Sequence, residues 1–105
     1  MSNDLEQINK ISELAISKGL NPGMLQDCAE KFGPGSPPVL GCLLALVREA
    51  WRDPGLACVA CSYTHENGYQ YRVVGGHHHG ATFRTIQKVY SLEEDALVAA
   101  LEAAP

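Results

Sequence analysis

The chain has 105 residues, of which 46% are hydrophobic and 19% are charged, a balance typical of a globular domain and not of a disordered segment. Eight basic residues against twelve acidic ones give a formal net charge of −4, which excludes a nucleic-acid partner because phosphates bind to clustered Lys and Arg. The length predicts a single domain over residues 1–105. The patterns described below make it an α+β domain, composed of a helical hairpin (1–33) and an α-β-β-β-α core (37–105).

The first 33 residues predict two helices joined by a short connection. The first helix ends at Gly19, and Asn21-Pro22 offers a cap and a first-turn proline for the second, which stops at Gly33. Apolar residues recur at helical spacing in both. The residues expected inside are Leu5, Ile8, Ile11 and Ala15 in the first helix, and Met24 or Leu25, Cys28 and Phe32 in the second.

A third helix is predicted from Pro37 to Arg52, with Ser36 as its cap. It is the most apolar element, and its apolar residues cover most of its circumference, which indicates contact on more than one side. These residues are Val39, Leu40, Leu43, Leu44, Leu46, Val47, Ala50 and Trp51. We expect this helix to pack centrally, between the N-terminal hairpin and a sheet. The alternative is that one of its faces forms an oligomer interface.

After the turn at 53–55 the pattern changes to period two and predicts strands. Leu56–Thr64 is the first strand, and Asn67-Gly68 favours a tight hairpin turn. With Asn67 and Gly68 as the loop residues, Glu66 lies opposite Tyr69. A third strand is expected from residue 82 to residue 90.

The last helix follows Ser91, which forms a capping box with Glu94. Leu92, Ala96, Leu97, Ala100 and Leu101 are expected to be buried. The predicted order is therefore α-α-α-β-β-β-α: three N-terminal helices, a three-stranded antiparallel meander and a C-terminal helix.

Three consecutive histidines, His77, His78 and His79, join the second and third predicted strands between glycines. Imidazole is a common ligand of transition metals, so the loop suggests zinc or nickel. On an extended chain His77 and His79 point to the same side and His78 points away, so a third ligand must come from another element or another chain. The alternative is a polar, glycine-flanked turn without metal.

The four cysteines are predicted to be reduced thiols, because the first 20 residues contain no apolar run typical of a secretory signal. Cys58 and Cys61 form a C-x-x-C inside a predicted strand, where residues three apart point to opposite faces. A metal or redox pair at Cys58 and Cys61 is therefore disfavoured. Cys28 and Cys42 lie on helices among apolar neighbours and are interpreted as packing residues.

Aromatic residues on the strands suggest a binding surface. Tyrosines on a half-open sheet offer contact area and a hydroxyl to a protein or small-molecule partner. Trp51, Tyr63, Tyr71 and Phe83 are the residues expected to line a pocket between the sheet and the helices.

The sequence contains neither phosphate-loop fingerprint and no convergent catalytic set. The longest apolar stretch, from residue 39 to residue 47, is about half the length of a membrane span. We therefore expect a cytoplasmic, non-catalytic binding module that forms a homodimer, with no membrane contact and no required cofactor. Metal binding at the histidine loop and a small-molecule pocket are the alternatives.

Overall fold

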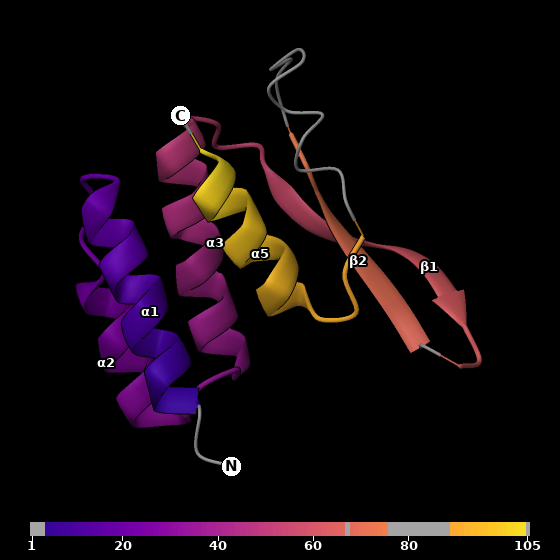
Figure 1. Ribbon diagram of the computed structural model, residues 1–105, viewed down its shortest axis with the longest axis horizontal. Helices are drawn as coiled ribbons and strands as arrows, with labels where there is room; N and C mark the ends of the chain where they lie inside the picture. Colours follow the sequence, from indigo (N-terminus) through magenta and orange to yellow (C-terminus); the bar gives the residue numbers. More distant parts are fainter. Residues whose placement is uncertain (1–3, 67, 76–88, 105) are drawn as a thin grey trace.

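The computed structural model describes residues 4–66, 68–75 and 89–104, and these form an α+β fold (Figure 1). The predicted class is confirmed. The described residues contain four helices and a two-stranded antiparallel sheet. The elements are α1 (Asp4–Ser17), α2 (Gly23–Phe32), α3 (Pro37–Trp51), β1 (Ala57–Thr64), β2 (Gly68–Val74) and α5 (Glu93–Ala103).

The two helices of the N-terminal hairpin form as expected, with Gly19 adopting a positive φ of 81° after α1. The cap of α2 differs, because the helix begins at Gly23 with Pro22, and not Asn21, in the N-cap position. Its buried hydrophobic residues are Ile8, Ile11, Ala15, Leu25 and Ala29. Leu5, Met24 and Phe32, in contrast, are exposed. Leu5 and Phe32 occupy the ends of their helices, where less of a neighbouring helix covers them. Of Met24 and Leu25, the two alternatives for the start of α2, Leu25 is the buried residue.

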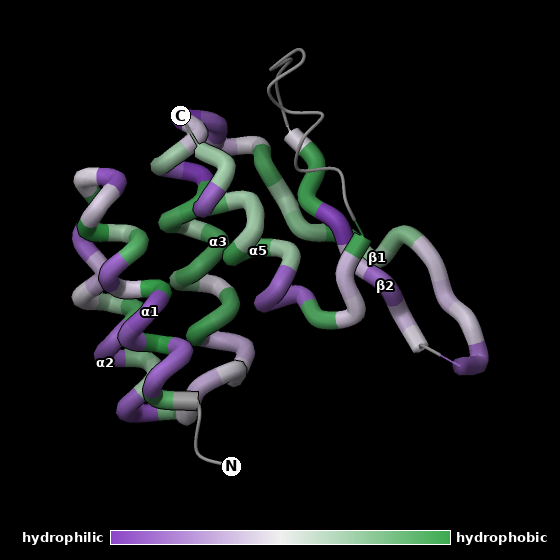
Figure 2. Tube along the Cα trace, in the orientation of Figure 1, coloured by the Kyte–Doolittle hydropathy of each residue, from purple (hydrophilic) through white to green (hydrophobic). Residues whose placement is uncertain are grey.

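The most apolar helix, α3, lies in the middle of the helical layer (Figure 2). Its buried residues are Val39, Leu43, Leu46, Val47 and Trp51. One side packs against α2, as expected from the hairpin, and the other packs against α5. The strands make most of their helix contacts with α5. The helix that packs against the sheet is therefore mainly α5, and not α3 as expected.

Side chains from distant parts of the sequence hold the C-terminal end of α5. The indole Nε1 of Trp51 donates to the Ala100 carbonyl at 2.8 Å, and the Lys18 Nζ donates to the carbonyls of Ala104 and Glu102 at 2.6 and 3.1 Å. The last four carbonyls of a helix have no partner within the helix. These two side chains therefore tie α3 and the end of α1 to α5.

The start of α5 differs from the predicted capping box. The helix begins at Glu93, with Leu92 in the N-cap position and no side-chain cap hydrogen bond there. Tyr90 is hydrogen-bonded through its backbone to Tyr71, so Ser91 belongs to the connection and the helix starts one residue later than the box requires. Three acidic side chains still occupy the first turn, which favours the helix dipole.

The hairpin register also differs from the expected one. Gly68 belongs to β2 and pairs with Thr64, and Tyr63 pairs with Tyr69, so Glu66 and Tyr69 are not opposite each other. An irregularity between Ala60 and Ser62 shifts the register by one more residue. The extra residue, Cys61, forms a β-bulge. No glycine or proline lies at this point of the sequence to indicate it.

The predicted third strand lies mainly outside the described residues, as do His77, His78, His79 and Phe83. At its end, Tyr90 forms an isolated antiparallel bridge with Tyr71, with N–O distances of 2.7 and 2.8 Å. The bridge occupies the edge of β2 that faces away from β1. Within the described ranges, no helix combines the length and the apolar character needed to cross a membrane.

Candidate binding groove between α2 and α3

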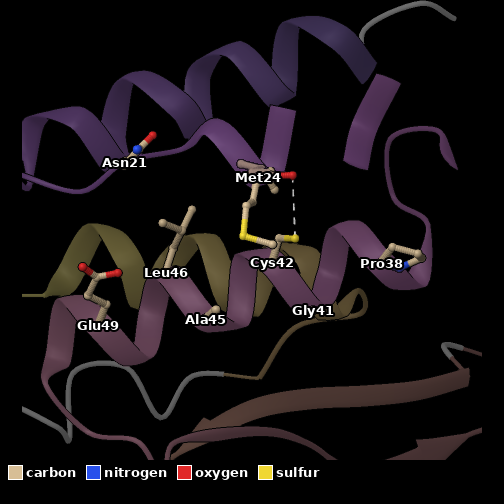
Figure 3. Close-up of a pocket in the computed structure, with 9 residues that line it drawn as sticks. Asn21, Met24, Pro38, Gly41, Cys42, Ala45, Leu46 and Glu49 are labelled. Atoms are coloured by element: carbon tan, nitrogen blue, oxygen red, sulfur yellow. Dashed lines mark hydrogen bonds between the residues drawn. The ribbon is translucent and has the colours of Figure 1, made fainter. Parts of the chain in front are cut away.

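An apolar groove of about 510 Å³ runs between α2 and α3 (Figure 3). Both helices and the turn before α2 supply its walls. The lining residues are Asn21, Met24, Leu25, Pro38, Gly41, Cys42, Ala45, Leu46 and Glu49. Apart from Asn21 and Glu49, the side chains are apolar or weakly polar, so the groove suits an apolar occupant.

The α3 wall exists because one stripe of this helix carries small side chains. Pro38, Gly41, Ala45 and Glu49 follow each other at spacings of three and four residues, which places them on one face. All four are exposed. The larger apolar residues of α3 are turned toward α2 and α5, and the small ones remain open to solvent.

The α2 wall is dominated by Met24, whose side chain is 74% exposed. Figure 3 shows this side chain extending from α2 across the groove in the direction of Cys42. Leu25, next in sequence, is buried and anchors α2 to the core. The exposed thioether is flexible and polarisable, and such side chains adapt to the shape of a partner.

One end of the groove is polar. Glu49 supplies a carboxylate there, and the Asn21 side-chain oxygen accepts a hydrogen bond from the Gly23 N–H at 2.9 Å. This local turn orders the start of α2. The groove therefore combines an apolar length with one acidic end.

Two cysteines meet where the helices are close together. The Sγ atoms of Cys28 and Cys42 are 3.4 Å apart, and the Cys42 thiol lies 3.8 Å from the Met24 carbonyl oxygen. Burial raises the pKa of the Cys42 thiol, and the neighbouring Cys28 raises this pKa further. Cys42 is therefore protonated at neutral pH and is a poor nucleophile in this state.

Both cysteines pack against the core, as interpreted from the sequence, but their pairing was not predicted. A signal for it exists. Cys28 and Cys42 are equally distant from Gly35 in the turn between the two helices, and such residues face each other in an antiparallel helical hairpin.

The aromatic residues expected to share a pocket lie in separate places. Trp51 is buried against α5, and Tyr63 is exposed near the hairpin tip, where its ring centroid is 4.9 Å from that of Tyr69. Tyr71 lines a hollow of about 410 Å³ beside Leu40 and the start of α5. Trp51 lines a different hollow, and Phe83 lies outside the described residues.

The C-x-x-C thiols differ in their surroundings. Burial, then the nearby Glu93 and Cys61, raise the pKa of Cys58 to about 11, so this thiol is protonated at neutral pH. Cys61 is exposed, and its thiol lies 3.6 Å from the Gln70 carbonyl oxygen. Among the described residues, no group of three His, Cys, Asp or Glu side chains is arranged to hold a metal ion. The proposed ligands His77 and His79 fall outside these residues, and a metal site there stays a prediction.

Comparison with known proteins adds no relative from which a function could be transferred. No protein-family model, no curated protein and no solved structure matches this chain. The groove between α2 and α3 and its neighbouring thiols are thus the features from which function is inferred.

Proposed function

We propose that the chain is a non-catalytic binding module that forms a homodimer through the groove between α2 and α3. The observation that carries this proposal is the position of Met24, an exposed apolar side chain directly beside an apolar groove. In a two-fold interface each copy presents the same patch. The flexible Met24 side chain of each copy then turns away from its own groove and enters the groove of the other.

The small residues of α3 support close packing of the two copies. Gly41 and Ala45 lie one helical turn apart on the exposed stripe. The distance between packed helices depends on the side chains at their contact, so small residues allow the partner backbone to approach. No large side chain of α3 has to move to admit the partner.

The charges at the two ends of the groove favour an antiparallel arrangement. Glu49 marks one end, and Lys31 lies in the last turn of α2, seven residues after Met24, toward the opposite end but outside the residues that line the groove. Residues seven apart share a helix face. When the two α3 helices cross antiparallel, Glu49 of each copy faces Lys31 of the other, and such complementarity sets the orientation of an interface.

The chemistry of the groove supports binding over catalysis. The raised pKa of Cys42 keeps its thiol in the neutral form, and the side chains along the rest of the groove are mostly apolar. A catalytic site needs a nucleophile or base with a partner that orients it. The polar groups Glu49 and Asn21 lie at one end, where they suit recognition.

Sedimentation velocity tests the homodimer. We expect the wild-type chain to dimerise at micromolar concentration. Met24→Glu should weaken the dimer at least tenfold because a carboxylate replaces the apolar side chain that enters the groove. Ala45→Arg should have the same effect by filling the groove with a charged side chain.

A control variant separates a local effect from a change in net charge. Gln26 is exposed and lies on the side of α2 opposite Met24, so Gln26→Arg should leave the dimer intact. A monomeric wild-type chain, or equal dimerisation of Met24→Glu and the wild type, would exclude the groove as the interface. Circular dichroism checks that each variant is folded.

A further inference from the structure

The thiols of Cys28 and Cys42 form a pair at the groove, and the proposed dimer assigns no chemical role to them. Their Sγ atoms are 3.4 Å apart, at the place where α2 and α3 are close together. Neither thiol belongs to a disulfide. Both side chains are half-buried, and Cys42 lines the groove, so a small reagent reaches its sulfur in the monomer, when no second copy fills the groove.

The geometry requires little movement for a bond between these sulfurs. The Sγ–Sγ distance must shorten by about 1.4 Å to reach the length of a disulfide. Rotation of the two side chains supplies part of this change. The helices that carry them are in contact, and Leu25 of α2 and Leu46 of α3 are both buried.

We propose that Cys28 and Cys42 are a modification site at which a reversible intramolecular disulfide forms by exchange with a low-molecular-weight disulfide. Cys42 reacts first because it lines the groove. Its thiolate attacks one sulfur of the reagent, forming a mixed disulfide and releasing one reagent thiol. The Cys28 thiol then loses its proton and attacks the Cys42 sulfur, which releases the second reagent thiol.

The exchange is balanced. Two protein thiols are oxidised to one disulfide, one reagent disulfide is reduced to two thiols, and the two protein protons end on those thiols. Burial keeps Cys42 protonated near neutral pH, and its pKa lies above the usual value. The reaction is therefore slow at neutral pH and becomes faster as the pH rises.

The test exposes the full chain to oxidised glutathione, blocks the remaining thiols by alkylation and maps the tryptic peptides by mass spectrometry. Trypsin places Cys28 and Cys42 on separate peptides, 19–31 and 32–48, and both thiols of the C-x-x-C on one peptide, 53–72. We expect the two separate peptides to be joined, and dithiothreitol to release them. Oxidation confined to Cys58 and Cys61 would overturn the proposal.

Single variants identify the order of the reaction. Cys28→Ser should accumulate a stable glutathione adduct on Cys42, because no second thiol resolves it. Cys42→Ser should leave Cys28 largely unmodified, because Cys28 is not part of the groove lining. An adduct of equal amount on both variants would contradict the assigned order and the role of the groove.

Thermal unfolding provides a second readout that does not depend on peptide recovery. A disulfide that closes the loop from residue 28 to residue 42 restricts the unfolded chain and should raise the Tm by roughly 10 °C or more. Cys58→Ser/Cys61→Ser is the matched control and should show the same increase. An oxidised chain with an unchanged or lower Tm would overturn the proposal, because it would mean that the bond strains the helix pair.

Discussion

The contact between Trp51 and the end of α5 offers the sharpest test of the fold. The side chain is 4% exposed, and its Nε1 donates to the Ala100 carbonyl at 2.8 Å. Trp51→Phe removes this donor and keeps an aromatic ring. A buried acceptor that loses its partner costs about 1–3 kcal/mol, and the space left by the smaller ring adds about 1 kcal/mol. We therefore expect a loss of about 2–4 kcal/mol in the free energy of unfolding.

Urea denaturation followed by far-ultraviolet circular dichroism measures this loss. Tryptophan fluorescence is unsuitable because Trp51 is the only tryptophan. Leu5→Ala is a control, since Leu5 is 61% exposed and its truncation should change stability by about 0.5 kcal/mol or less. A loss below about 1 kcal/mol in Trp51→Phe would refute the assignment of the indole as a main link between α3 and α5.

Three further predictions follow from other contacts. Lys18→Met removes the donor to the Ala104 and Glu102 carbonyls and should cost about 1 kcal/mol in urea denaturation, whereas Lys10→Met should cost much less. Gly41→Ala has open space for its methyl group and should stabilise the monomer by about 0.5–1 kcal/mol while weakening the dimer, so an unchanged dimer would contradict the proposed interface. The pKa of Cys58 is raised from 9.0 to about 11 in the folded chain, so the free energy of unfolding of the wild type should fall between pH 9 and 11. Cys58→Ala should lose less over this range. An equal fall in the free energy of unfolding of both proteins would show that Cys58 is not the group responsible.

The local structure could be predicted well from the sequence. Glycine at 19 and at 33 ends a helix in each case, and Leu25 and Ala15 are buried as helical spacing requires. These features depend on residues close together in the chain. The backbone conformation open to a glycine and the spacing of apolar residues are enough to specify them.

The order of the layers could not be predicted in the same way. Both α5 and the β-hairpin of β1 and β2 have apolar residues that must be buried, and either element could pack on the side of α3 that α2 leaves open. What decides between them is a set of long-range contacts, among them the bond from Trp51 to Ala100 and the bonds from Lys18 to the end of α5. No local pattern around Trp51 or Lys18 identifies a partner so far away in sequence.

The hairpin register was missed for a different reason. Asn67-Gly68 is a strong turn signal, but Gly68 is the first residue of β2 and pairs with Thr64. The bulge at Cys61 then shifts the remaining pairs by one residue. Bulges accept many residue types, so the sequence around Cys61 gives no warning of the shift.

The groove shows why hydrophobicity alone does not identify the open surface of α3. From the sequence, the large apolar residues of this helix suggested a face for a second copy, yet Val39, Leu43 and Val47 are buried inside the chain. The surface that stays open carries Gly41 and Ala45, which contribute little to any measure of hydrophobicity. Its apolar character comes largely from Met24, a residue of another helix. A groove of this kind can be recognised only once the packing of α2 on α3 is known, because its lining residues come from both helices.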